Sequence, residues 1–142
     1  FHAVDRGEVK DIDTVLIIGC GMGGLGAVVR AALRGATVIA ADIDDEKLAL
    51  AKELGATHTI NSMTEDIHAR LSDITSGFGP DVIIEAVGSA RTYQTAIEEV
   101  AFTGRVVFIG YAKTAVEFQT KLLTYAVHAT PLHPTSALSS IT

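Results

Sequence analysis

The fold is decided by residues 14–26, which have the sequence TVLIIGCGMGGLG. Residues 14–18 form a short apolar run that ends at a glycine, which predicts a strand buried on both faces. Apolar positions from 25 to 33 then recur at helical spacing, so a helix follows the glycines directly. This order predicts a buried strand that feeds, through a glycine-rich turn, into a helix packed on the same sheet.

The same alternation continues as far as residue 110. Apolar runs at 37–41, 58–60, 82–87 and 106–109 predict four further strands. Capping residues, helical apolar spacing and closing glycines predict the helices between them. Five apolar strands alternating with four helices predict an α/β protein with a doubly wound parallel sheet, the Rossmann fold.

The length of 142 residues fits one domain, and a barrel of eight such units would need about 250 residues. We expect residues 1–13 to be a helix end and a connector, and residues 14–118 to be the folded domain. Within it, residues 116–118 are predicted to be a short edge strand, and residues 119–142 an atypical C-terminal tail. The first residue is Phe rather than Met, so we expect a piece of a longer protein.

Composition excludes several classes of function. The formal net charge of −6 disfavours nucleic acid and anionic membranes as partners. The stretch 122–142 has no charged residue, but prolines and histidines interrupt it, so no membrane span is predicted. The single cysteine, Cys20, excludes an internal disulfide and favours a reducing, cytoplasmic location. The histidines lack the spacing of zinc ligands.

Gly19, Gly21 and Gly24 match the spacing G-x-G-x-x-G between a predicted strand and a predicted helix. In a dinucleotide-binding turn the first glycine permits the tight turn, the second lets a pyrophosphate approach the backbone, and the third lets the helix pack closely. The helix N-terminus then presents free N–H groups to the phosphates. Met22 and Gly23 complete this candidate site. The alternative is that the glycines make a tight turn and nothing more.

Asp42 ends the second predicted strand, about 20 residues beyond the first glycine. A carboxylate there can accept two hydrogen bonds from an adenosine ribose and would repel a 2′-phosphate, so it favours NAD over NADP. Asp42 could instead cap the next helix, but Asp44 and Asp45 are also placed to do so. Ile43 and Lys47 are predicted to flank the adenosine, although Lys47 is equally consistent with a solvated helix position.

Ligands of doubly wound folds bind at the carboxyl ends of the strands. The ends of the fourth and fifth strands are therefore candidates for the nicotinamide side of the cofactor. They comprise Ala86, Val87 and Gly88, and Ile109, Gly110 and Tyr111. We identify no catalytic residue: Cys20 is interpreted as a loop filler, and Glu85, in a buried strand, as a satisfied buried acid.

Several blocks of this sequence resemble one known family. Residues 19–26, 41–47, 49–56, 79–88 and 104–110 look like the cofactor domain of the medium-chain dehydrogenase/reductase superfamily, which includes zinc-containing alcohol, threonine and polyol dehydrogenases. The resemblance covers residues 1–118. It implies that Gly19, Gly21 and Gly24 bind the pyrophosphate of NAD and that Asp42 binds its ribose. The implied reaction is hydride transfer between the nicotinamide and a small-molecule alcohol, polyol or carbonyl compound.

The resemblance also implies what this chain lacks. In that family the catalytic zinc ligands and a four-cysteine zinc lobe belong to a separate N-terminal domain. We therefore expect this chain to bind NAD without carrying a complete active site or a metal. Family members often dimerise through the sixth strand of the cofactor domain, so a homo-oligomer is also implied.

Two other functions stay open at this point. Residues 15–21 also resemble the first motif of methyltransferases that use S-adenosylmethionine, with Asp42 as the ribose acid. The acid common before the glycines of that motif is absent, because Ile17 and Ile18 stand there. A non-catalytic NAD-sensing module would share the glycine turn but not the later blocks.

Overall fold

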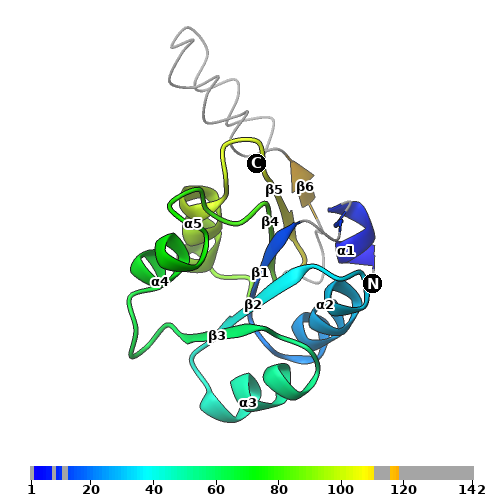
Figure 1. The fold of residues 1–142 in the computed structure, drawn as a ribbon, viewed down its shortest axis with the longest axis vertical. Coiled ribbons are helices and arrows are strands. Elements are labelled where there is room, and N and C mark those ends of the chain that lie inside the picture. Colours follow the sequence, from blue (N-terminus) through cyan, green and yellow to red (C-terminus); the bar gives the residue numbers. More distant parts are fainter. Residues whose placement is uncertain (1, 8, 11–12, 111–115, 119–142) are drawn as a thin grey trace, which may run out of the picture.

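The computed structural model describes residues 2–7, 9–10, 13–110 and 116–118. They form one sheet with helices on both sides (Figure 1). In chain order the elements are α1 (His2–Arg6), β1 (Thr14–Ile18), α2 (Met22–Leu33), β2 (Thr37–Asp42), α3 (Asp45–Glu53), β3 (His58–Asn61), α4 (Ile67–Ile74), β4 (Val82–Glu85), α5 (Ala90–Glu99), β5 (Arg105–Phe108) and β6 (Val116–Phe118).

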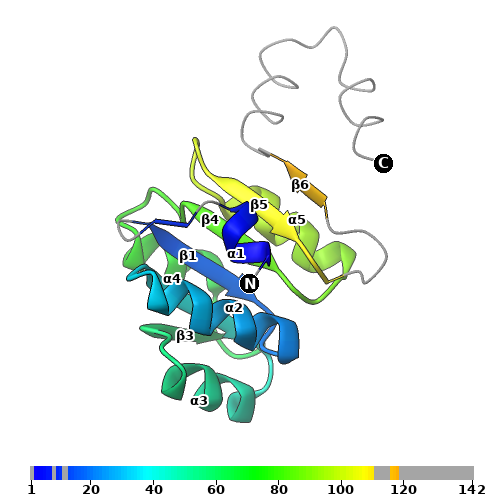
Figure 2. The same ribbon diagram turned by 90° about the vertical axis from the view of Figure 1, so that its right-hand side faces the viewer.

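The sheet has the strand order β3-β2-β1-β4-β5-β6. Strands β1 to β5 pair in parallel, and β6 pairs antiparallel with β5 at the edge. Figure 2 shows β6 alongside β5 and α1 beside the same end of the sheet. The prediction of a doubly wound parallel sheet is confirmed, as is the edge strand at 116–118. The predicted tail lies outside the described residues.

The strands are apolar throughout because both faces of the sheet are covered. In β1, Val15 and Ile17 belong to one hydrophobic cluster, and Leu16 and Ile18 belong to the other. The first cluster includes buried residues of α1, α2 and α3, and the second includes those of α4 and α5. Figure 1 shows these two helical layers on opposite sides of the sheet.

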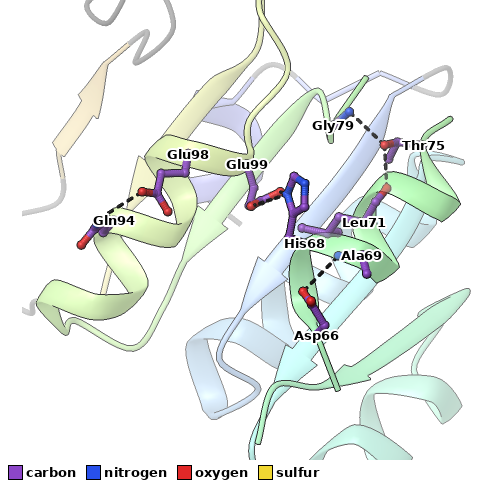
Figure 3. Close-up of polar contacts among 9 residues, drawn as sticks. All are labelled: Asp66, His68, Ala69, Leu71, Thr75, Gly79, Gln94, Glu98 and Glu99. Atoms are coloured by element: carbon purple, nitrogen blue, oxygen red, sulfur yellow. Dashed lines mark hydrogen bonds and ion pairs between the residues drawn. The ribbon is translucent and has the colours of Figure 1, made fainter. Parts of the chain in front are cut away.

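Three of the helices begin at a side-chain cap. Asp44 caps α3, Asp66 caps α4 and Ser89 caps α5, each by accepting a hydrogen bond from a backbone N–H of the first turn. The cap of α4 appears in Figure 3 as the contact from Ala69 N–H to Asp66 Oδ1, 3.1 Å long. Asp44 therefore takes the capping role that was the alternative for Asp42.

Helices α4 and α5 are also joined to each other (Figure 3). The Nδ1 atom of His68 lies 2.9 Å from both carboxylate oxygens of Glu99. Hydrogen bonding to Glu99, followed by the charge of Glu99, raises the pKa of the His68 imidazole. At the C-terminal end of α4, Thr75 donates a hydrogen bond to the Leu71 carbonyl and accepts one from the Gly79 N–H.

Several predicted strand ends are wrong by one or two residues: β2 and β3 each extend one residue further than predicted, to Asp42 and Asn61. Strand β4 ends at Glu85 rather than at residue 87, and β5 covers 105–108 rather than 106–109. The early end of β4 has a local cause. The Glu85 carboxylate accepts hydrogen bonds from the Val87 and Gly88 N–H groups, which curls the chain into a turn directly after the strand.

Candidate functional site

The site lies where the direction of the strand order reverses. Strand β1 is between β2 and β4, so the turns that follow these strands surround a common crevice. A cleft of about 340 Å³ occupies this position. Its lining residues come from the ends of the first four strands and from the helices that follow β2 and β4. They are Ile18, Gly19, Gly21, Ala41, Asp42, Ile43, Lys47, Ser62, Ala86, Val87 and Thr92.

The three glycines of the G-x-G-x-x-G spacing meet different steric conditions. Gly19 has a φ of +100°, and a Cβ there would lie 2.8 Å from Val87 Cγ2. A Cβ at Gly24 would lie 1.7 Å from the Gly19 carbonyl oxygen, so this position requires glycine for α2 to pack on the turn. A Cβ at Gly21 would meet no atom within 4 Å. The fold therefore requires glycine at 19 and 24, whereas Gly21 borders open space.

The N-terminus of α2 differs from those of α3, α4 and α5. Its N-cap is Gly21, which has no side chain and so makes no side-chain hydrogen bond to the first turn. The first N–H groups of a helix have no intrahelical acceptor, and they lie at the positive end of the helix dipole. The helix therefore presents unsatisfied donors beside the cleft that Gly21 lines, which is the arrangement that binds phosphate.

Asp42 connects the second strand to the glycine turn. Its Oδ2 accepts a 2.7 Å hydrogen bond from the Cys20 N–H, and its Oδ1 accepts bonds from Ile43 N–H at 2.7 Å and Asp44 N–H at 2.9 Å. A carboxylate has about four acceptor positions, so one stays open, on Oδ2. Backbone N–H groups therefore already use part of the hydrogen-bonding capacity of Asp42, and its two predicted bonds to a ribose stay a prediction.

Cys20 is fully buried in the turn between Gly19 and Gly21. Burial, and then the negative charge of Asp42, raise the pKa of its thiol to about 12, although Lys47 acts in the opposite direction. A thiol that stays protonated is a poor nucleophile, which supports the interpretation of Cys20 as a loop filler. Lys47 is exposed and lines the cleft.

The structure brings together seven of the predicted site residues in the cleft lining: Gly19, Gly21, Asp42, Ile43, Lys47, Ala86 and Val87. Six others are not among the lining residues: Met22, Gly23, Gly24, Gly88, Ile109 and Gly110. Met22 is 92% exposed at the start of α2, and Gly110 packs against the backbone of Gly88. Tyr111 lies outside the described residues.

Two polar lining residues were missed by sequence reasoning, Ser62 and Thr92. Ser62 follows the last residue of β3, so the rule that ligands bind at carboxyl ends of strands would have found it. Thr92 lies in the first turn of α5 and forms a capping box with Ser89. Its contact with the cleft depends on how α5 sits against β4, which no local pattern indicates.

Two kinds of feature are missing from the residues that the structure describes. They include no group of three or more His, Cys, Asp or Glu side chains able to hold a metal ion. Across the same residues, no helix combines the length and the apolar character needed to cross a bilayer.

Comparison with known proteins assigns the family. The sequence profile of the zinc-binding dehydrogenases matches residues 24–130. The chain belongs to the zinc-binding dehydrogenase family. An uncharacterized zinc-type alcohol dehydrogenase-like protein of Haemophilus influenzae is 36% identical over 124 residues, which are 87% of this chain and 36% of that protein. The erythritol/L-threitol dehydrogenase of Mycolicibacterium smegmatis is 37% identical over 77% of this chain and 30% of its own length.

Solved structures of zinc-binding dehydrogenases have the same fold. The alcohol dehydrogenase TADH from Thermus sp. ATN1 superposes with a TM-score of 0.72 at 36% identity, covering 79% of this chain and 33% of that one. The chain thus spans about a third of the length of the relatives that it matches. Its membership confirms the resemblance to medium-chain dehydrogenases, and nothing in the comparisons supports the methyltransferase alternative.

Proposed function

We propose that this chain binds NAD in the cleft between β2, β1 and β4, as the cofactor-binding part of an oxidoreductase. The reaction would transfer a hydride between the nicotinamide and an alcohol, polyol or carbonyl compound. One observation carries the proposal: the Asp42 carboxylate is bonded to the glycine turn through Cys20 N–H, 2.7 Å away, beside the uncapped N-terminus of α2. A ribose acceptor and a phosphate site are thus held at a fixed separation.

The residues of this chain would bind and orient the cofactor. Unsatisfied N–H groups of α2 would face the pyrophosphate across Gly21, and Asp42 would accept a hydrogen bond from a hydroxyl of the adenosine ribose. When bound, NAD supplies the carbon that accepts or donates the hydride. Names of relatives such as an NAD-dependent alcohol dehydrogenase of Sulfurisphaera tokodaii support this cofactor.

The zinc that the family name implies finds no site among the described residues, because they contain no cluster of candidate ligands. We propose that zinc and the substrate are held by a separate catalytic domain, as the resemblance to medium-chain dehydrogenases implies. On this proposal the chain binds NAD but does not oxidise alcohols by itself. Its single buried cysteine is consistent with a cytoplasmic location.

The test is calorimetric titration of the purified chain with NADH, NADPH and S-adenosylmethionine. We expect saturable NADH binding that is tighter than NADPH binding, because a carboxylate and a 2′-phosphate repel each other by about 1–4 kcal/mol at 4 Å. In Asp42→Asn the affinity ratio of NADH to NADPH should fall by about tenfold or more. The ratio is the informative quantity, because loosening of the Cys20 contact affects both ligands.

Asp66→Asn is the matched control. Asp66 is also an aspartate that accepts backbone N–H bonds at a helix start, but it caps α4 and does not line the cleft. We expect it to leave both affinities unchanged. Binding of S-adenosylmethionine in place of NADH would overturn the proposal, as would an unchanged NADH to NADPH ratio in Asp42→Asn.

A further inference from the structure

Glu85 is a buried acid at the carboxyl end of β4. Its side chain is fully buried, and it is paired in the sheet with Ile18 of β1 and Phe108 of β5. A carboxylate at such a position is costly unless hydrogen bonds compensate for the lost water. None of the ion pairs within the described residues involves Glu85. Within the described residues, the donors to its carboxylate are neutral backbone N–H and hydroxyl groups.

Those donors lie close together in the sequence, in the turn that follows β4 and in the first turn of α5. The Glu85 carboxylate accepts bonds from Val87 N–H at 3.1 Å and from Gly88 N–H at 2.9 Å, and the Thr92 hydroxyl donates a third. The sequence prediction of a satisfied buried acid is thus confirmed. The Glu85 carboxylate also orients its donors: it fixes two consecutive peptide groups after β4 and the first turn of α5.

The backbone of Glu85 holds the neighbouring strand end as well. Its carbonyl oxygen accepts bonds from Ile109 N–H at 2.8 Å and Gly110 N–H at 3.0 Å. Gly110 and Gly88 are in close contact, since a Cβ on Gly110 would lie 2.1 Å from the Gly88 nitrogen. Glu85 therefore bonds through its side chain to the β4 turn and through its main chain to the β5 end.

We propose that Glu85 is a positioning residue that fixes the wall of the cleft on the nicotinamide side. This inference rests on the proposed NAD site and adds the residue that shapes one half of it. Glu85 does not line the cleft itself, whereas Ala86, Val87 and Thr92, which it places, do. The adenosine side has a different anchor, Asp42, which bonds to the glycine turn. The two halves of the cofactor are thus oriented by separate carboxylates.

Comparing the binding of two ligands distinguishes this positioning role of Glu85 from a general contribution to the stability of the fold. NADH carries both halves of the cofactor, and ADP-ribose lacks the nicotinamide ring. In Glu85→Gln an NH₂ group replaces one acceptor oxygen and faces backbone N–H donors, so the turn loses part of its support. Because hydrogen bonds to charged groups are among the stronger ones, we expect NADH affinity to fall by about tenfold or more. ADP-ribose affinity should stay within about twofold of wild type.

Glu99→Gln is the matched control, because Glu99 contacts His68 on α4 and lies outside the cleft lining. It should leave both affinities unchanged. If circular dichroism shows that Glu85→Gln is unfolded, Glu85→Asp answers the question. It keeps the charge on a side chain one methylene shorter, and we expect a smaller, equally selective loss of NADH. Amide exchange at Gly88 should be faster in either folded variant without any ligand.

The outcomes distinguish the two proposals. If the wild-type chain binds neither NADH nor ADP-ribose, the proposed function fails. If the wild type binds both, but the folded Glu85 variants weaken both equally or weaken neither, the positioning role of Glu85 is overturned and the proposed function stands. If the Glu85 variants lose NADH affinity but keep ADP-ribose affinity, the proposed function and the positioning role are both supported.

Discussion

The substitution Gly24→Ala tests the most crowded contact of the glycine turn. The added Cβ would lie 1.7 Å from the Gly19 carbonyl oxygen and 2.8 Å from the Gly19 carbonyl carbon, where ordinary contacts begin at 3.4 Å. Both atoms belong to the backbone of a turn that is itself held by Gly19 N–H bonding to the Ala41 carbonyl. Neither partner can rotate out of the way as a side chain could, so α2 must shift as a unit.

The magnitude follows from two opposing contributions. Overpacking a well-filled interior costs about 1–3 kcal/mol, and a backbone clash of this size belongs at the upper end. Alanine regains about 1 kcal/mol over glycine in a helix. We therefore expect a net loss of about 2 kcal/mol in the free energy of unfolding. For a chain of 142 residues this lowers Tm by roughly 8 °C.

Gly23→Ala is the control, one residue earlier in the same helix. Its Cβ would meet Ile109 Cδ1 at 3.7 Å, an ordinary contact. The helix propensity of alanine then dominates, and stability should rise by about 0.5–1 kcal/mol. Thermal and urea unfolding followed by circular dichroism measure both variants. If Gly24→Ala unfolds at the same temperature as Gly23→Ala, the steric argument for the third glycine is refuted.

Two further predictions concern titrating groups. Because burial raises the pKa of Cys20 to about 12, its thiol should react with iodoacetamide orders of magnitude more slowly in the native chain than in urea, and comparable rates near neutral pH would contradict this placement. The pKa of His68 is raised in the folded state by Glu99, so the pair stabilises the fold below the unfolded histidine pKa of about 6.5, and this contribution disappears as pH rises through the folded value. The Tm difference between wild type and His68→Gln should therefore be larger in acid than in base, and a difference independent of pH would rule out this contribution.

Much of the fold could be predicted because its sheet is covered on both faces. A strand such as β1 must then be apolar at every position, and the capping residues and glycines mark where each helix begins and ends. Asp42 could be proposed as a site residue in a similar way, because that prediction needs only the position of one acid at the end of one predicted strand. These features are local in sequence, so a single chain displays them.

What the sequence could not indicate depends on particular side-chain contacts, some local and some between distant segments. The Cys20 N–H bond that occupies one acceptor position of Asp42 joins the turn after β1 to the end of β2, and spacing alone does not distinguish an open carboxylate from a partly filled one. The early end of β4 also depends on the Glu85 side chain folding back on the following turn. Thr92 lines the cleft because of how α5 packs against the sheet. In each case the strand or helix was predicted correctly, but the contacts of its side chains were not.

The central position of β1 has a consequence for how the chain folds. Its pairing with β2 joins segments separated by a single helix, whereas the bond from Thr14 N–H to Asp81 Oδ2, directly before β4, joins residues 67 positions apart. Because closing the longer loop costs more entropy, we expect the unit from β1 to β3 to form before β4 and β5 are added. The two walls of the cleft come from these two units. On this expectation the cleft is completed late in folding, when the second half of the sheet packs against β1 after the first half has formed.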